Sequence, residues 1–223
     1  MAAVVPAFHE APRVGAVVRV LRATPGIDAV VVVDDGSRDG TADAARMEGA
    51  HVVALPQNVG KGGAMLAGVR AVPWADAVVF VDADLSGLTS AHVDALATPL
   101  RTGTAEMAVG RLDGWSDAKA LRLGGQRAAL RSIPLRAPDL GAAGYGAEVA
   151  LTRQARAAGG RTVLVPLPGV ASAYKVRKYG LSGAFALGTR MRWDVARASG
   201  GGLWPLWAAL AVAAGVAGAE AWS

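Results

Sequence analysis

Val78-Val79-Phe80-Val81-Asp82-Ala83-Asp84 is the stretch that decides both the fold and the chemistry of this chain. Its four apolar residues predict a buried strand, and two carboxylates follow at its end. Each carboxylate would cost on the order of several kcal/mol in lost hydration if it were dry and unpaired. A divalent cation that joins the acids to a phosphate-bearing ligand explains the pair most simply. Because ligands of α/β sheets bind at the carboxyl ends of strands, the stretch indicates phosphate chemistry.

The residues around this stretch alternate between two kinds of pattern. Short apolar or β-branched runs predict strands at 3–6, 29–33, 51–55, 78–81 and 105–109. Apolar residues at helical spacing predict helices at 14–21, 41–48, 61–71 and 91–100. This rhythm predicts an α/β fold, with a mostly parallel sheet and helices on both faces.

Beyond residue 111 the pattern is looser. Residues 113–122 are polar and poorly periodic. We expect helices at 124–130 and 148–158, a strand at 162–166 and a basic helix at 185–198. The predicted organisation is one domain over 1–199, with a nucleotide-binding half (1–110) and an acceptor half (111–199).

A second strand, Val30 to Val33, also ends in acids, namely Asp34 and Asp35 before Gly36. Carboxylates in this place can accept hydrogen bonds from base N–H groups or ribose hydroxyls. The alternative is an ordinary turn that caps the next helix, since Asp, Gly and Ser are common turn residues. Taken alone, this pattern favours the turn.

The segment Asn58-Val59-Gly60-Lys61-Gly62-Gly63-Ala64 is a glycine-rich loop that opens a helix. Its backbone N–H groups and Lys61 can meet phosphate oxygens. It does not satisfy GxxxxGK[ST], so it is not a P-loop. The chain also lacks the GxGxxG pattern in the place where dinucleotide enzymes have it, which disfavours NAD.

Four segments in this order resemble the family-2 glycosyltransferases of the GT-A fold: residues 5–10, 31–41, 58–64 and 79–87. They cover about the first half of the chain. The resemblance implies a UDP- or GDP-sugar donor, with Mg²⁺ or Mn²⁺ bound at the DxD motif. The ion would neutralise charge that develops on the nucleoside diphosphate leaving group.

The resemblance also implies roles for individual residues. Those placed around the nucleotide sugar are Pro6, Ala7, Glu10, Asp34, Asp35, Gly36, Lys61, Asp82 and Ala83. Among these, Asp34 and Asp35 would hold the base and ribose, and Lys61 would lie near the nucleotide. Asp82 would face the ribose or the metal, and Asp84 would bind the metal.

Two later segments, 123–128 and 144–148, are similar to a narrower group. This group comprises glucosyl-3-phosphoglycerate synthases and polyprenyl-phosphate sugar transferases, in which the second segment lines the sugar and acceptor pocket. Glu148 is then the candidate catalytic base if the enzyme inverts configuration, and a ligand of sugar hydroxyls if it retains configuration. The alternative is an acid favoured by the dipole at a helix N-terminus.

The chain departs from these relatives in two places. They often supply a His metal ligand after a Pro-x-x-Gly-Val segment, whereas residues 169–174 here contain none. The three His lie at 9, 51 and 92, and His9 stands where the family commonly has Asn. The segment 111–124 is also shorter than its counterpart.

Charge and the C-terminal segment indicate partners. The net charge is +5, and basic residues at 175, 177, 178, 190, 192 and 197 suit an acceptor phosphate or anionic lipid headgroups, unless they form a solvated face. No recognition motif indicates nucleic acid. The absence of Cys fits a reducing compartment, and no signal peptide is seen.

Residues 200–202 are Gly and predict a hinge before an apolar helix over 203–219. With its Trp residues, 203–222 is long enough for peripheral membrane contact; the alternative is packing on the core or on a partner. We therefore expect a cytoplasmic protein, at the inner face of the membrane if this contact is made. The sequence does not decide whether the protein forms a homodimer.

The leading hypothesis is a metal-dependent glycosyltransferase that acts on a phosphorylated small molecule or a lipid-linked phosphate. One alternative is a nucleotide-sugar-binding protein of the same fold without transferase activity. Another is a sugar-1-phosphate nucleotidyltransferase, for which the expected activation loop is missing.

Overall fold

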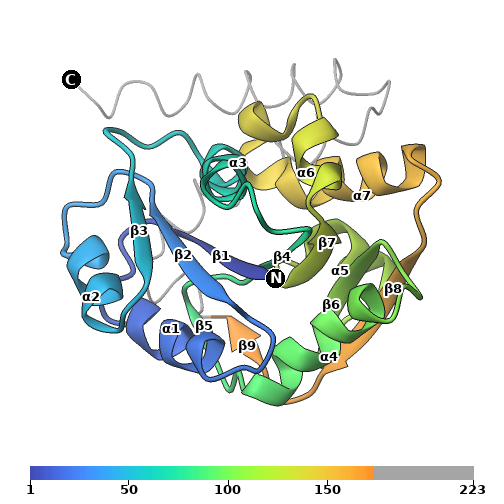
Figure 1. Cartoon of the computed structure of the whole chain (residues 1–223), viewed down its shortest axis with the longest axis horizontal. Coiled ribbons are helices and arrows are strands. Elements are labelled where there is room, and N and C mark those ends of the chain that lie inside the picture. The colour runs from blue at the N-terminus through green and yellow to red at the C-terminus, as the bar shows by residue number, and fades with distance from the viewer. Residues whose placement is uncertain (173–223) are drawn as a thin grey trace, which may run out of the picture.

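A seven-stranded sheet forms the centre of the computed structural model, which describes residues 1–172 apart from the side chain of Tyr145 (Figure 1). Its strands are β1 (Ala2–Ala7), β2 (Ala29–Asp34), β3 (His51–Ala54), β4 (Ala77–Phe80), β6 (Met107–Leu112), β7 (Arg127–Leu130) and β8 (Thr162–Leu167). They follow the order β3-β2-β1-β4-β7-β6-β8. Only β7 among them runs antiparallel to its two neighbours, β4 and β6. The predicted α/β fold with a mostly parallel sheet is confirmed.

Helices cover both faces of the sheet, as Figure 1 shows. They are α1 (Val14–Arg22), α2 (Thr41–Met47), α3 (Lys61–Ala71), α4 (Ser90–Arg101), α5 (Asp117–Leu123), α6 (Ser132–Arg136) and α7 (Ala147–Ala157), with 3₁₀ turns η1 (Leu140–Ala142) and η2 (Gly144–Gly146). Helices α1, α2 and α4 contribute to the core on one face, and α3, α6 and α7 to the core on the other. Among residues 1–172, none of these helices combines the length and the hydropathy needed to span a bilayer.

The alternation of side chains along the central strands produces these two cores. Val5 and Val79 enter the core on the α1 and α4 face, whereas Val4 and Phe80 enter the core on the α3 face. Strands that are buried on both faces need apolar residues at every position. This requirement explains the uninterrupted apolar runs in β2 and β4.

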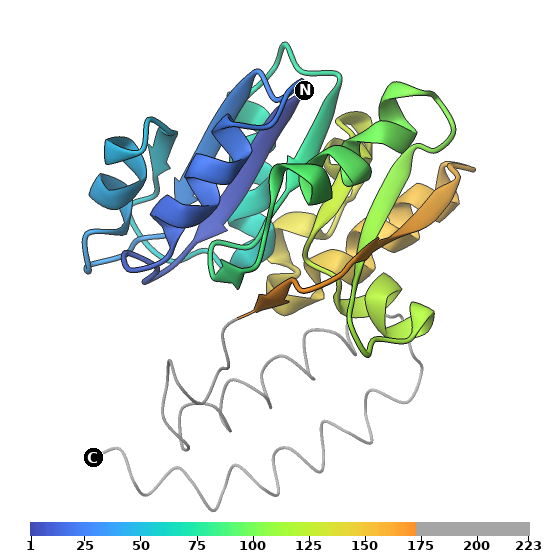
Figure 2. The ribbon, with the colours of Figure 1, turned by 90° about the horizontal axis from the view of Figure 1, so that it is seen from below.

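The sheet has a switch point between β1 and β4. From β1 the chain builds outward through β2 and β3, then crosses to β4 on the other side of β1. In folds of this kind, ligands bind in the crevice outside the carboxyl ends of the strands at such a switch point. A small sheet of β5 (Leu85–Ser86) and β9 (Ala171–Ser172) follows β4 at this edge. Figure 2 shows how the chain continues from β8 to β9.

One prediction of secondary structure is wrong, and one helix was not predicted. Residues 124–130 do not form a helix: β7 occupies Arg127–Leu130, because its alanines fit between β4 and β6 despite their low strand propensity. Residues 117–123, whose polar and poorly periodic sequence indicated no element, form α5, with Ser116 capping its N-terminus through a hydrogen bond from the Lys119 N–H.

Several other predictions lie outside the described residues. These are the basic helix at 185–198, the glycine hinge at 200–202 and the apolar helix over 203–219. The boundary of the predicted domain at residue 199 lies there too. The division into two halves at residue 110 stays a prediction.

Candidate active site

The carboxylate of Asp82, just beyond β4, is held on both oxygens. The ammonium of Lys61 lies 2.6 Å from Oδ1, and Nε2 of Gln126 donates to Oδ2 at 2.9 Å. Gly125 packs directly against this group, since a Cβ placed on it would lie 2.2 Å from Oδ2. The start of β7 therefore forms one wall of the site. Because β7 is antiparallel, its first residues lie at the same edge as the last residues of β4.

Lys61 is the first residue of α3 and links Asp82 to Glu148 in the first turn of α7. Its ammonium lies 2.6 Å from Oε1 of Glu148, whose side chain is only 6% exposed. Burial alone would lower the pKa of Lys61, but the charges of Asp82 and Glu148 outweigh it, so the pKa is raised. Lys61 therefore stays charged at physiological pH and keeps a positive centre at the crevice.

Asp84 has a different environment. Its Oδ2 accepts a hydrogen bond from the Ser172 hydroxyl at 3.0 Å, and no other donor among residues 1–172 contacts this carboxylate. Burial raises the pKa of Asp84, and the nearby charges of Asp82 and Glu10 add to the rise. A carboxylate that is partly buried beside other acids is stabilised when a cation binds to it.

The residues around Asp84 fit a small divalent cation. Carboxylate and hydroxyl oxygens are hard donors, and Mg²⁺ usually binds through one or two carboxylates while water and substrate phosphates complete its shell. Within residues 1–172, no group of three or more His, Cys, Asp or Glu side chains forms a complete metal cage. A single carboxylate of this kind could hold such an ion only together with ligands from outside the described residues, such as water or a phosphate. Asp82, which the sequence analysis also expected at the metal, has both oxygens occupied by protein donors.

The two acids that end β2 have separate contacts. Asp35 accepts hydrogen bonds from the N–H groups of Val59 and Gly60 at 2.7 and 2.9 Å. Burial nevertheless raises the pKa of Asp35. Asp34 accepts one bond at Oδ1, from the N–H of Ser37 at 3.0 Å. Asp35 thus holds the glycine-rich loop in place, and Asp34 is the acid with an oxygen left for a ligand among the described residues.

The end of β1 lies beside this turn. The carbonyl of Ala7 accepts a hydrogen bond from the Asp35 N–H at 2.9 Å, and Pro6 pairs with Val33 in the adjacent strand. Glu10 is 5% exposed and accepts from Nε of Arg13 at 2.8 Å.

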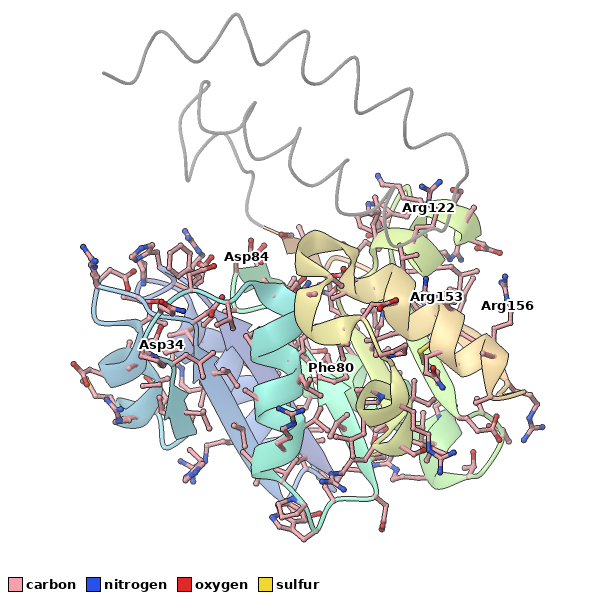
Figure 3. The ribbon with its side chains drawn as sticks, turned by 90° about the horizontal axis from the view of Figure 1, so that it is seen from above. Asp34, Phe80, Asp84, Arg122, Arg153 and Arg156 are labelled. Carbon is pink, nitrogen blue, oxygen red and sulfur yellow. The ribbon has the colours of Figure 1, made fainter. Side chains whose placement is uncertain are left out.

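The remaining predicted residues of the site are Gly36 and Ala83. Gly36 has a φ of 77°, in the region that favours glycine, and it packs against the backbone of Gln57. Ala83 is buried and lies between Asp82 and Asp84 in the chain. The structure therefore brings all the predicted site residues to one edge of the sheet. In Figure 3, Asp84 lies at this edge, beyond Phe80 of β4.

Sequence reasoning did not assign a role to three residues at or behind this site: Gln126, Arg127 and Ser172. Arg127 is fully buried and donates to the carbonyls of Gly124 and Leu121, at 2.5 and 2.9 Å, and to the Thr152 hydroxyl at 2.7 Å. It therefore ties α5 to α7 behind the wall of the site. Burial lowers the pKa of Arg127 to about 10, which still leaves it charged at neutral pH. The available sequence signal was that Gln126 and Arg127, two polar residues, directly precede an alanine pair in an otherwise apolar strand.

The fold and this site are those of an α/β protein whose polar site lies at the switch point of its sheet, the place where ligands of such folds bind. The chain matches the family described as Glycosyl transferase family 2 over residues 2–162 and belongs to that family. It is therefore a glycosyltransferase, and the resemblance inferred from the sequence is confirmed. Membership in this family also argues against the alternative that the chain is a sugar-1-phosphate nucleotidyltransferase. No curated protein matches the chain.

Solved structures are similar over most of the chain. Glucosyl-3-phosphoglycerate synthase from Mycobacterium tuberculosis, in complex with phosphoglyceric acid, is 25% identical with a TM-score of 0.72; the match covers 89% of this chain and 79% of that one. The same enzyme with Mn²⁺, UDP-glucose and phosphoglyceric acid gives a TM-score of 0.71 at the same identity and coverage. Mannosyl-3-phosphoglycerate synthase from Rubrobacter xylanophilus, at 24% identity, has the same fold, with a TM-score of 0.70 and coverage of 88% and 71%.

Proposed function

We propose that this glycosyltransferase moves a sugar from a UDP- or GDP-sugar to a phosphorylated acceptor, with Mg²⁺ or Mn²⁺ held by Asp84. The observation that carries the proposal is the carboxylate of Asp84, which lies at the switch-point edge with the Ser172 hydroxyl as its one described donor. The mycobacterial synthase, which binds Mn²⁺, UDP-glucose and phosphoglyceric acid, supports the same ligand classes here.

Different residues of the site would bind different parts of the nucleotide-sugar donor. Asp34, with one oxygen held by the Ser37 N–H, would accept hydrogen bonds from the base or ribose. Asp35 would act through the loop that it holds, so that the loop backbone and Lys61 lie beside the diphosphate. The bound metal ion would supply positive charge to the diphosphate leaving group.

Glu148 is the candidate carboxylate for the transferred sugar. Its Oε1 is engaged by Lys61, while no described residue donates to its other oxygen. The Lys61 ammonium, 2.6 Å from Oε1, holds the side chain in place and leaves the other oxygen to accept hydrogen bonds from a ligand. We therefore favour a role in which Glu148 accepts hydrogen bonds from sugar hydroxyls over one in which it removes a proton.

The class of acceptor follows from the relatives and from charge. A phosphorylated small molecule, such as the phosphoglyceric acid bound by the mycobacterial enzyme, is our first choice. A lipid-linked phosphate is the second, because the basic residues at 175–197 and the apolar segment 203–222 suit a membrane surface. Contact with the inner face of the cytoplasmic membrane belongs to this second choice.

A transfer assay tests the proposal. The enzyme would be incubated with Mn²⁺, radiolabelled UDP-glucose, UDP-galactose or GDP-mannose, and either 3-phosphoglycerate or a polyprenyl phosphate. We expect one donor to yield labelled product that is lost with EDTA and in Asp84→Asn. A donor that binds without transfer to either acceptor would favour the non-catalytic alternative. If no donor stabilises the protein against heat, the proposed site is wrong.

A further inference from the structure

The hydroxyl of Ser172 lies against the carboxylate of Asp84 although 88 residues separate them in the chain. The antiparallel pairing of β5 with β9 creates this proximity, because it places Ser172 opposite Leu85, the residue after Asp84. The hydroxyl donates to Oδ2 at 3.0 Å, which leaves Oδ1 without a donor among the described residues.

The small sheet that carries Ser172 is itself tightly held. Gly87 approaches the carbonyl of Gly169 so closely that a Cβ on Gly87 would lie 2.1 Å from that oxygen. The Gly169 N–H donates to Oδ2 of Asp113 at 2.8 Å, and the Ser86 hydroxyl donates to the carbonyl of Ala171 at 3.3 Å. These contacts fix the position of β9 relative to the end of β4.

We infer that Ser172 is a positioning residue for the metal: it holds Asp84 so that Oδ1 is presented to the cation. This inference rests on the proposed function. An unrestrained Asp side chain rotates about its terminal torsion and must be ordered when an ion binds. A hydrogen bond to the far oxygen orders it in advance, in the way that partners behind metal ligands usually do.

The inference also specifies the kind of metal site. Ser172 is the described residue that contacts Asp84 from β9. The Asp84 carboxylate offers hard oxygen atoms, and Ser172 donates to it without adding an imidazole nitrogen, which suits Mg²⁺ and Mn²⁺ better than Zn²⁺ or Ni²⁺. The site would therefore bind the hard ions through Asp84, water and the donor phosphates.

A matched pair of substitutions isolates the hydroxyl. Thr and Val have the same shape, so Ser172→Thr and Ser172→Val differ at this position only in the presence of the hydroxyl. Ser86→Ala is the control, because Ser86 belongs to the same small sheet and bonds to Ala171 instead of Asp84. Mn²⁺ affinity would be measured with UDP present, from the electron paramagnetic resonance signal of free Mn²⁺, together with the melting temperature in EDTA.

We expect Ser172→Val to bind Mn²⁺ about 10-fold more weakly, the lower end of the effect of removing a partner behind a metal ligand. Ser172→Thr and Ser86→Ala should bind it as the wild type does, and all variants should melt alike in EDTA. Equal Mn²⁺ affinity in the Thr and Val variants would overturn the inference while leaving the proposed function intact. If the wild type itself shows no UDP-dependent Mn²⁺ binding, both are wrong.

Discussion

The ammonium of Lys61 lies 2.6 Å from Oε1 of Glu148, although the two residues are 87 positions apart in the chain. The same ammonium lies 2.6 Å from Oδ1 of Asp82. One cation thus joins the first turns of α3 and α7 to the end of β4. The three charged groups form one connected cluster, whereas Asp84 accepts its hydrogen bond from a different partner, Ser172.

Replacing Lys61 with Met should destabilise the fold. Asp82 and Glu148 would be left without their cation, and breaking a largely buried ion pair in this way costs about 3 kcal/mol. The loss would be measured as a change in the free energy of unfolding in urea. Arg46→Met is the control, since its pair with Asp43 is exposed and should contribute less than about 1 kcal/mol. Equal losses in both variants would show that the Lys61 link is not structural.

Gly36 and Gly40 provide a matched pair for the turn after β2. Both have a positive φ, 77° and 82°, so alanine is strained at either position by about 1–2 kcal/mol. Only at Gly36 would the new Cβ also meet the backbone, 2.8 Å from the carbonyl carbon of Gln57, whereas nothing lies within 4 Å at Gly40. We expect Gly36→Ala to lower stability and UDP affinity more than Gly40→Ala. Calorimetry and thermal unfolding would check this, and similar values for both variants would contradict the packing of the turn on the loop.

Gln126 should matter through the donor it gives to Asp82. Gln126→Ala leaves Oδ2 of a partly buried carboxylate without its donor, which costs about 1–3 kcal/mol. Gln126→Glu should be worse, because it places a second carboxylate where the amide was. Turnover and urea unfolding would both be measured, with Gln154→Glu on α7 as the control. If the Glu variant is as stable and as active as the wild type, the hydrogen bond from Gln126 to Asp82 contributes to neither stability nor turnover.

Asp84→Asn should stabilise the metal-free protein at neutral pH. The pKa of Asp84 is raised above its ordinary value of 3.8, first by burial and then by Asp82, so the ionised form costs stability. Below pH 3.8 the carboxyl is protonated in both the folded and the unfolded protein, so the cost is absent. The cost is incurred as the pH rises through the folded-state pKa. In EDTA, the variant should therefore unfold at higher urea than the wild type at pH 7, and the difference should shrink toward pH 4. A variant that is less stable at pH 7 would contradict this account.

Much of the site could be predicted from sequence because each strand end carries its own local signal. The apolar run before Asp82 and the one before Asp34 show both that a buried strand is present and where it ends. Parallel strands then bring their ends to one edge, which is enough to gather residues from β1, β2 and β4. Lys61 was found from another local signal, the glycine-rich loop that surrounds it.

The contacts across the sheet could not be predicted, because no local pattern encodes them. The wrong assignment of residues 124–130 as helical hid Gln126, which reaches Asp82 only because β7 is antiparallel. The alanines of that run favour a helix, and burial between two strands overrides this preference. Ser172 depends on the pairing of two short strands that are far apart in the chain. Likewise, nothing local showed that the loop after β3 would occupy both oxygens of Asp35.

We expect the edge at Asp84 to bind a nucleoside diphosphate together with a divalent cation. Isothermal titration of UDP into the wild type and into Asp84→Asn, each with Mn²⁺ and again after EDTA, tests it most directly. We predict that the wild type binds UDP with Mn²⁺ and loses at least about 10-fold in affinity with EDTA, whereas the variant shows no such dependence on the metal. Equal UDP affinity of the two proteins in Mn²⁺ would contradict the account.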